Sequence, residues 1–263
     1  MPYFHQQDAN LYYHVEGIGE PIIFISGLNC DLRIWNKTAE ELKKNYQVIT
    51  MDNRGVGESD AIKGVITIEM LAQDVIALMH HLNIGKATLV GHSMGGTVVQ
   101  TIAYLKPEMV QKLVICNSLI KVGRLNRFLG ALLQVLRVCG VAPQPILKRA
   151  FPFLFAKKFR KDKTRLKEVA NKFIVQPNCP EKLFTHQKQL QALLQFDSRP
   201  WLSQLSVPTL VIAGAQDRLC PHDSKMIAAL IPQAKFISLP EVGHVPMIET
   251  PDHFISILKE FIN

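Results

Sequence analysis

A serine flanked by glycines, in the run Gly91-His-Ser-Met-Gly95, constrains the fold of this chain more than any other feature. The residues just before it are apolar and predict a strand, and the residues just after it predict a helix. A strand that turns at once into a helix needs small residues two positions either side of the turn. Gly91 and Gly95 meet that need, and Gly96 relieves the crowding further. The pattern predicts a sharp turn that presents the Ser93 hydroxyl above the edge of a sheet.

Two further residues complete a candidate set for nucleophilic catalysis. A serine hydroxyl is a weak nucleophile unless a base takes its proton, and a carboxylate usually orients that base. Asp217 follows an apolar run over 209–213. His244 follows another such run over 235–239. Because the carboxyl ends of parallel strands meet at one edge of a sheet, we predict Ser93 as nucleophile, His244 as base and Asp217 as the acid that orients the base.

The nearest rivals for the acid and the base are less well placed. Asp223 better fits the start of a helix than the end of a strand. His222 follows no predicted strand directly. We expect the other histidines to be structural or exposed. The side chain of His92, which is adjacent to Ser93, is expected to point away from the nucleophile.

A tetrahedral oxyanion needs two hydrogen-bond donors that are already in place, and losing one typically costs about 10²- to 10³-fold in rate. One donor is expected to be the backbone N–H of Met94, at the start of the helix that follows the serine. The second should come from the loop after the third strand. We assign it to the N–H of Leu28, because Gly27 lets the backbone come close. An ordinary tight turn is the alternative interpretation of this loop.

Strand-like and helix-like segments alternate over both ends of the chain. This alternation is typical of an open, mostly parallel sheet with helices on both faces. The first two strands lie three residues apart and predict an antiparallel hairpin. The fold class is therefore α/β, with an eight-stranded sheet. The expected strands cover 3–7, 11–15, 21–26, 47–51, 87–90, 112–116, 209–213 and 235–239. The expected helices around them cover 38–44, 68–82, 97–105, 223–230 and 252–261.

Residues 118–200 break the alternation. They show no clear strand, and prolines separate helical stretches over 125–138 and 164–174. The segment carries 17 Lys and Arg against four Asp and Glu, a formal charge of +13, whereas the rest of the chain carries −5. We interpret it as a helical cap inserted into a core formed by 1–117 and 201–263. Its many apolar residues suggest a lid over an acyl pocket, with an electropositive outer face.

Five motifs in order resemble the α/β-hydrolase superfamily, and the resemblance covers nearly the whole chain outside the cap. The motifs are Phe24-Ile-Ser-Gly-Leu28, Asp52-Asn-Arg-Gly-Val-Gly-Glu-Ser59, Gly91-His-Ser-Met-Gly-Gly96, Pro208-Thr-Leu-Val-Ile-Ala-Gly-Ala-Gln-Asp217, and Gly243-His244 with Glu249-Thr-Pro251. Ser26 is a departure, because many members carry His before the oxyanion glycine. We expect Ser26 to hydrogen-bond within its loop. The oxyanion site would then have altered properties but would not be lost.

Within the superfamily, the chain resembles small cytosolic serine esterases and lactonases with a helical lid. These include enol-lactone hydrolases, meta-cleavage product hydrolases and pimeloyl-carrier-protein methyl ester esterases. The resemblance implies hydrolysis of a carboxylic ester or thioester through an acyl-enzyme, with no cofactor or metal. Ser93 argues against haloalkane dehalogenases and epoxide hydrolases, which carry Asp at that position. A C–C bond hydrolase, a cofactor-free peroxidase and a non-catalytic hydrolase-fold receptor stay open as alternatives, because fold alone does not decide function.

The densest run of basic residues is Lys157-Lys-Phe-Arg-Lys-Asp-Lys163, within the predicted cap. A positive field of this kind attracts acidic partners. We name Lys157, Lys158 and Arg160 as candidate partner-binding residues, with an acyl carrier protein or an anionic membrane surface as the partner. A solvated helix face or loop is the alternative. Nucleic acid is not expected, because no nucleic-acid-binding motif accompanies the charge.

The cysteines and the termini bear on the compartment. Five cysteines at wide spacing, with no Cys-x-x-Cys pair, predict free thiols in a reducing compartment rather than a zinc site. The first ten residues lack the basic start and apolar run of a signal peptide. No run reaches the roughly 18 apolar residues of a membrane span. We therefore expect a cytoplasmic protein whose substrate, acyl length, oligomeric state and lid position are left open.

Overall fold

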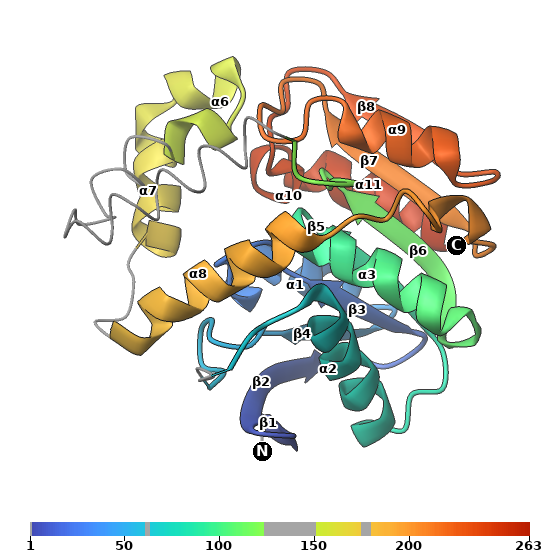
Figure 1. Cartoon of the computed structure of the whole chain (residues 1–263). Coiled ribbons are helices and arrows are strands. Elements are labelled where there is room, and N and C mark those ends of the chain that lie inside the picture. Colours follow the sequence, from blue (N-terminus) through green and yellow to red (C-terminus); the bar gives the residue numbers. More distant parts are fainter. Residues whose placement is uncertain (1, 61–63, 124–150, 175–179) are drawn as a thin grey trace.

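One eight-stranded sheet runs through the molecule (Figure 1). The structure is a computed structural model, and it describes residues 2–60, 64–123, 151–174 and 180–263. The strands are β1 (Tyr3–Gln6), β2 (Ala9–Glu16), β3 (Pro21–Ile25), β4 (Gln47–Met51), β5 (Ala87–His92), β6 (Val110–Cys116), β7 (Thr209–Gly214) and β8 (Lys235–Leu239). Their order across the sheet is β1-β2-β4-β3-β5-β6-β7-β8.

The strand directions match the class predicted from the sequence. From β4 to β8 across the sheet, neighbouring strands run parallel. Among the eight strands of the described residues, only the pairs β1–β2 and β2–β4 are antiparallel. β1 and β2 form the expected hairpin, in which Tyr3 lies opposite Tyr12. The predicted mostly parallel, eight-stranded α/β sheet is therefore confirmed.

Alternate side chains of the inner strands supply two hydrophobic cores, one on each face of the sheet. In β3, Ile23 and Ile25 belong to the core that also contains apolar residues of α2, α3 and α9. Ile22 and Phe24 belong to the core shared with α1 and α11. All four side chains are completely buried, as expected for a strand with both faces covered. These helices are α1 (Asn36–Leu42), α2 (Ile68–His81), α3 (Met94–Leu105), α9 (Asp223–Leu230) and α11 (Pro251–Ile262).

The local sequence explains where α2 begins and which face it buries. Thr67 is the N-cap residue, and its Oγ1 accepts a hydrogen bond from the Met70 N–H at 3.0 Å. Such a cap satisfies a backbone donor that the helix leaves without an internal partner. The buried apolar residues of α2 recur every three or four positions, and they are Ile68, Leu71, Ala72, Val75, Ile76, Leu78 and Met79. This helical period had predicted the element from the sequence.

The structure corrects one helix start in a way that matters for the site. The helix expected over 97–105 begins three residues earlier, at Met94. The strand before it is also longer than expected and ends at His92. Strand and helix therefore meet at Ser93 without a loop. The expectation placed the boundary too late because the glycines that follow the serine weaken the helical signal.

Helices α6 (Lys157–Lys161), α7 (Lys163–Ile174) and α8 (Pro180–Gln195) lie in the chain between β6 and β7, and Figure 1 shows α6 and α7 set apart from the helices that cover the sheet. Helix α7 matches the stretch expected over 164–174. The helix expected over 125–138 lies outside the described residues. Helix α8 was not predicted, because glutamines and other polar residues interrupt its apolar pattern. The division into core and cap stays a prediction.

No helix in the part of the chain that the structure describes is both long enough and apolar enough to cross a membrane.

Candidate active site

Ser93 occupies a strained turn between β5 and α3. Its backbone φ is +54°, a value that side chains with a Cβ rarely adopt. A Cβ added at Gly91 would lie 2.3 Å from the Gly95 carbonyl oxygen, and one at Gly95 would lie 2.1 Å from the Ile25 carbonyl oxygen. At Gly96 it would lie 2.4 Å from the side chain of Ser118. Each glycine is therefore required by a close approach, as expected for a turn that exposes its serine.

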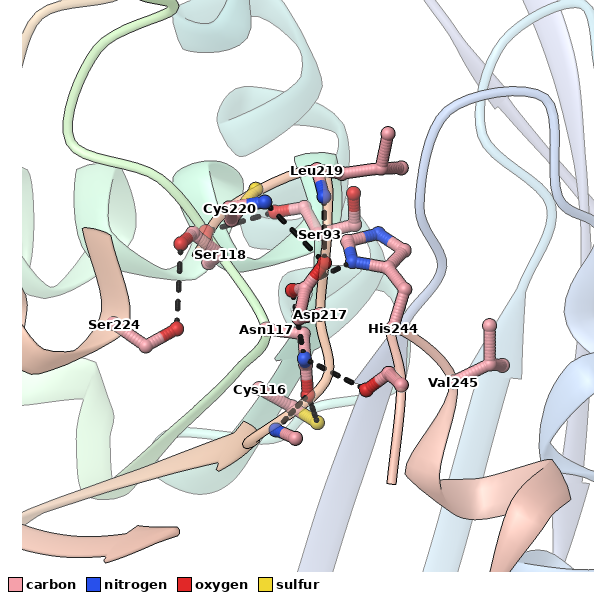
Figure 2. A network of polar contacts seen from close by, with 12 residues as sticks. Ser93, Cys116, Asn117, Ser118, Asp217, Leu219, Cys220, Ser224, His244 and Val245 are labelled. Atoms are coloured by element: carbon pink, nitrogen blue, oxygen red, sulfur yellow. Dashed lines mark hydrogen bonds and ion pairs between the residues drawn. The ribbon is translucent and has the colours of Figure 1, made fainter. Parts of the chain in front are cut away.

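The structure brings the predicted base and acid together. His244 Nδ1 lies 2.9 Å from Asp217 Oδ2, and both side chains are buried. Figure 2 shows the Ser93 side chain next to the His244 ring. With Nδ1 donating its proton to the carboxylate, Nε2 carries the lone pair that can accept a proton from a hydroxyl. Three side chains far apart in the sequence thus meet beyond the carboxyl ends of β5, β7 and β8.

Asp217 lies in an environment that keeps it ionised. Burial alone would raise the pKa of this carboxyl, but the charge of His244 and hydrogen bonds from His244, Asn117 and Leu219 lower it to about 2. The Asn117 Nδ2 donates to Asp217 Oδ2 at 2.8 Å and to the Gly243 carbonyl at 3.2 Å (Figure 2). Asn117 therefore joins the loop of the acid to the loop of the base.

Glu249 fixes the loop of the base from the other side. Its Oε1 accepts the Gly243 N–H at 2.9 Å, and its Oε2 accepts the Ala156 N–H at 2.8 Å. The His244 N–H donates to the Leu154 carbonyl at 2.7 Å. Because Ala156 and Leu154 precede α6, the segment before that helix helps to hold the base. The sequence motif had marked Glu249, but not these contacts.

His92 is one of the residues whose contacts the sequence analysis did not predict. It is 2% exposed, and its ring centroid lies 4.9 Å from that of His244. Burial lowers the pKa of His92 to about 3, so the ring is neutral at ordinary pH. The expectation that it would be structural is consistent with this burial. Adjacency to Ser93 was the only available signal, and it does not reveal which loop the ring contacts.

The two residues assigned as oxyanion donors both lie near Ser93. Met94 follows the serine directly as the first residue of α3. Leu28 lines the same pocket as Ser93, and a Cβ at Gly27 would lie 3.1 Å from the Ser93 Cβ. The loop that carries Leu28 is braced by Ser26, whose Oγ accepts from the Trp35 indole at 3.0 Å and donates to the Asp31 carbonyl at 3.2 Å. Ser26 thus hydrogen-bonds within its loop.

A pocket of about 300 Å³ opens beside Ser93 and His244. Its lining comes from the loops of the site and from the segments between β6 and β7, and consists of Gly27, Leu28, Cys30, Ile34, His92, Ser93, Leu119, Val122, Leu154, Phe155, Val169, Leu190, Leu193, Leu219, Cys220, His244, Val245 and Ile248. Among these described lining residues there is no Lys, Arg, Asp or Glu. The pocket therefore suits an apolar, uncharged group.

Three of the buried side chains could in principle hold a metal ion, since ligand atoms of Asp217, Cys220 and His244 lie within 4.8 Å of one another. The hydrogen bonds of the site favour another use. Asp217 Oδ1 accepts from the Leu219 N–H at 2.8 Å, and Oδ2 accepts from Asn117 and His244. Burial raises the pKa of the Cys220 thiol well above its usual value, so the thiolate that a metal prefers is disfavoured. The arrangement fits an acid–base pair better than a metal site.

The predicted partner-binding residues lie on α6. Lys157 and Lys158 are exposed, whereas Arg160 is half-buried. Lys158 Nζ lies 3.1 Å from Glu241 Oε2, and both of these side chains are mostly exposed. Such an exposed pair contributes little to stability.

Comparisons with known proteins agree with this geometry. A family model described as the alpha/beta hydrolase fold matches residues 20–251. The 3-oxoadipate enol-lactonase 2 of Acinetobacter baylyi is 32% identical over 97% of this chain and 96% of its own. The structure of the enol-lactonase from Burkholderia xenovorans LB400 matches with a TM-score of 0.88 and 25% identity, over 99% of both chains. A thermophilic esterase from Thermogutta terrifontis matches with a TM-score of 0.85 and 28% identity, over 97% of this chain and 93% of its own.

The sheet order and the matched family place the chain among hydrolytic enzymes built on a mostly parallel sheet with helices on both faces. The chain belongs to the α/β-hydrolase family. Its similarity to enol-lactonases and an esterase confirms the resemblance inferred from the five sequence motifs.

Proposed function

We propose that the protein hydrolyses carboxylic esters, or thioesters, through an acyl-enzyme formed on Ser93. The observation that carries the proposal is the strained serine turn beside a histidine whose Nδ1 is held 2.9 Å from a buried carboxylate. The apolar pocket next to it supports a small-molecule substrate with an apolar, uncharged acyl group. The enol-lactonases and the esterase in the comparison cleave the same type of bond, by their names.

In the proposed first step, the Ser93 Oγ forms a bond to the carbonyl carbon while its proton passes to His244 Nε2. The π-electron pair moves to the carbonyl oxygen, which the N–H groups of Leu28 and Met94 stabilise. Collapse of this intermediate breaks the ester C–O bond, and His244 protonates the leaving alkoxide. Water then attacks the acyl-enzyme with His244 as base, which releases the acid and regenerates Ser93.

Burst kinetics with a panel of aryl esters of increasing acyl length test this function. An initial burst equal to the enzyme concentration, labelling by a fluorophosphonate and loss of both in Ser93→Ala would support it. Absence of burst and labelling in the wild type would favour a non-catalytic receptor. Activity that depends on peroxide would favour a peroxidase, and cleavage of a C–C bond without ester cleavage would favour a C–C hydrolase.

As a second candidate function, we propose hydrolysis of an ester on an acyl chain that is bound to an acyl carrier protein. Leu154 and Phe155 line the pocket, and the basic helix α6 begins two residues later at Lys157. A negatively charged carrier could therefore contact α6 while its acyl chain enters the pocket.

Charge reversal of Lys157, Lys158 and Arg160 to Glu tests this second candidate. KM for a carrier-bound ester should rise, while KM for a small aryl ester should not. Lys86→Glu is the control. Lys86 is exposed and lies just before the amino end of β5, whereas Ser93 follows the carboxyl end of the same strand. Equal effects on both substrates would contradict the idea. Binding to anionic vesicles, lost on charge reversal, would instead indicate a membrane surface as the partner.

A further inference from the structure

We propose that Gln189 is a positioning residue, which holds the loop that supplies the Leu28 oxyanion donor. This inference rests on the proposed function, because it assumes that Leu28 stabilises an oxyanion. Gln189 lies on α8, about 160 residues from the loop along the chain, and its side chain is completely buried. Burying an amide side chain without hydrogen-bond partners costs free energy. The hydrogen bonds of Gln189 therefore indicate its role.

The Gln189 amide joins two loops that leave the carboxyl ends of adjacent strands. Its Oε1 accepts the Asn29 N–H at 3.2 Å, in the loop after β3. Its Nε2 donates to the Arg54 carbonyl at 3.0 Å, in the loop after β4. Each half of the amide thus has a partner of the right polarity, which also fixes its orientation.

The bond to Asn29 acts next to the proposed donor. The loop forms a turn in which the Cys30 N–H donates to the Gly27 carbonyl at 3.2 Å, with Asn29 at a left-handed φ of +57°. The peptide group between Leu28 and Asn29 is the central one of this turn. A peptide group rotates as a rigid plane, so holding the Asn29 N–H also holds the carbonyl of Leu28. The Leu28 N–H lies in the preceding peptide plane, which shares the Leu28 Cα with the plane that Gln189 holds. Loss of the Gln189 bond therefore removes a restraint on the whole turn, and with it a restraint on the orientation of the Leu28 N–H.

The same helix also forms part of the pocket wall. Leu190 and Leu193 line the pocket, and Leu190 is adjacent to Gln189. An acyl group that packs against these leucines therefore contacts the helix that holds the oxyanion loop. Helix α8 thus links binding of the acyl group to the orientation of the Leu28 N–H. This link favours substrates whose acyl chain is long enough to contact α8.

Gln189→Met removes both hydrogen bonds at nearly constant shape. Losing an oxyanion donor lowers kcat by about 10²- to 10³-fold. A donor that is only misoriented should therefore lower kcat by about 10- to 100-fold, while KM for an aryl hexanoate changes less than about twofold. An alkyl trifluoromethyl ketone gives a second measurement. Ser93 Oγ adds to its carbonyl carbon, the proton passes to His244, and the oxygen becomes an oxyanion. Its inhibition constant should rise by about the same factor as kcat falls, whereas the affinity for the matching secondary alcohol should not change.

Two comparison variants separate positioning from structural damage. Gln191→Met places the same substitution on an exposed site of α8 and should leave kcat unchanged. Gln189→Glu can still accept the Asn29 N–H, and should lose less kcat than Gln189→Met. Rates are measured well below the lowest thermal midpoint of the set, so that an unstable variant still reports on catalysis.

The outcomes distinguish this inference from the proposed function. A wild type that forms no ketone adduct and takes no fluorophosphonate label would overturn the function itself. An active wild type with unchanged kcat in Gln189→Met would overturn only the role of Gln189. Equal weakening of ketone and alcohol binding, or equal loss in the Glu and Met variants, would also overturn it, because the effect would then not come from the Asn29 contact.

Discussion

The Nε2 atom of His92 lies 2.8 Å from the backbone carbonyl oxygen of His244. Because the carbonyl can only accept, Nε2 of His92 carries the proton and donates it. The residue next to the nucleophile in sequence therefore holds the backbone of the base. Its other nitrogen, Nδ1, is buried and has no hydrogen-bond partner among the described residues, which fits a ring kept neutral by burial.

Removal of the His92 hydrogen bond should impair catalysis more than folding. In His92→Phe, the His244 carbonyl loses its donor and the base is held less firmly, so we expect kcat to fall by about tenfold. His92→Gln places an amide N–H near the former Nε2 and should recover part of that loss. Steady-state kinetics on an aryl ester, with thermal midpoints for all three proteins, would check this. A similar kcat for His92→Phe and the wild type would contradict it.

The lowered pKa of His92 makes stability depend on pH. The unfolded histidine binds a proton below a pKa of about 6.5, whereas in the folded protein the pKa is about 3. Between these values the unfolded state binds more protons, so stability falls as the pH drops from about 6.5 toward about 3. Urea unfolding at several pH values should show this slope in the wild type and a shallower one in His92→Phe. Parallel curves for the two proteins would disprove the assignment.

Asp217→Asn tests the carboxylate that orients the base. An amide that donates to His244 Nδ1 would favour the wrong tautomer, so we expect kcat to fall by about 10⁴-fold with little change in KM. Leu219 and Cys220 donate backbone N–H groups to Asp217 Oδ1, and the Asn oxygen can still accept them. The variant should therefore stay folded, as circular dichroism would show. Substantial activity in this folded variant would assign the acid to another residue.

The glycines of the serine turn should be far less tolerant than a surface glycine. In Gly95→Ala, the new Cβ would lie 2.1 Å from the Ile25 carbonyl oxygen, which is backbone and cannot move without shifting β3. We expect a loss of about 2–4 kcal/mol in the free energy of unfolding. Gly85→Ala is the control, since nothing lies within 4 Å of its added Cβ, and it should change stability by less than about 0.5 kcal/mol. Denaturant unfolding curves measure both, and equal stability of the two variants would refute the steric argument.

The local sequence was enough to predict the strands and the three candidate catalytic residues. Short continuous apolar runs predicted the inner strands, and apolar residues recurring every three to four positions predicted the helices. Ser93, Asp217 and His244 could be chosen because each follows a predicted strand, and parallel strands end at the same edge. The glycine spacing around Ser93 carried the same information, since a sharp turn leaves no space for a Cβ.

The tertiary structure alone decided which residues hold these groups in place. Gln189 reaches Asn29 across 160 residues, and His92 reaches the His244 carbonyl across 152. Asn117 reaches the Gly243 carbonyl, and Glu249 reaches the Ala156 N–H, and both contacts form only when distant segments pack together. A periodic pattern reports the backbone conformation of neighbouring residues, whereas a hydrogen bond between distant segments depends on how the elements pack. For that reason the candidate catalytic residues could be predicted from the sequence, whereas the contacts that position them could not.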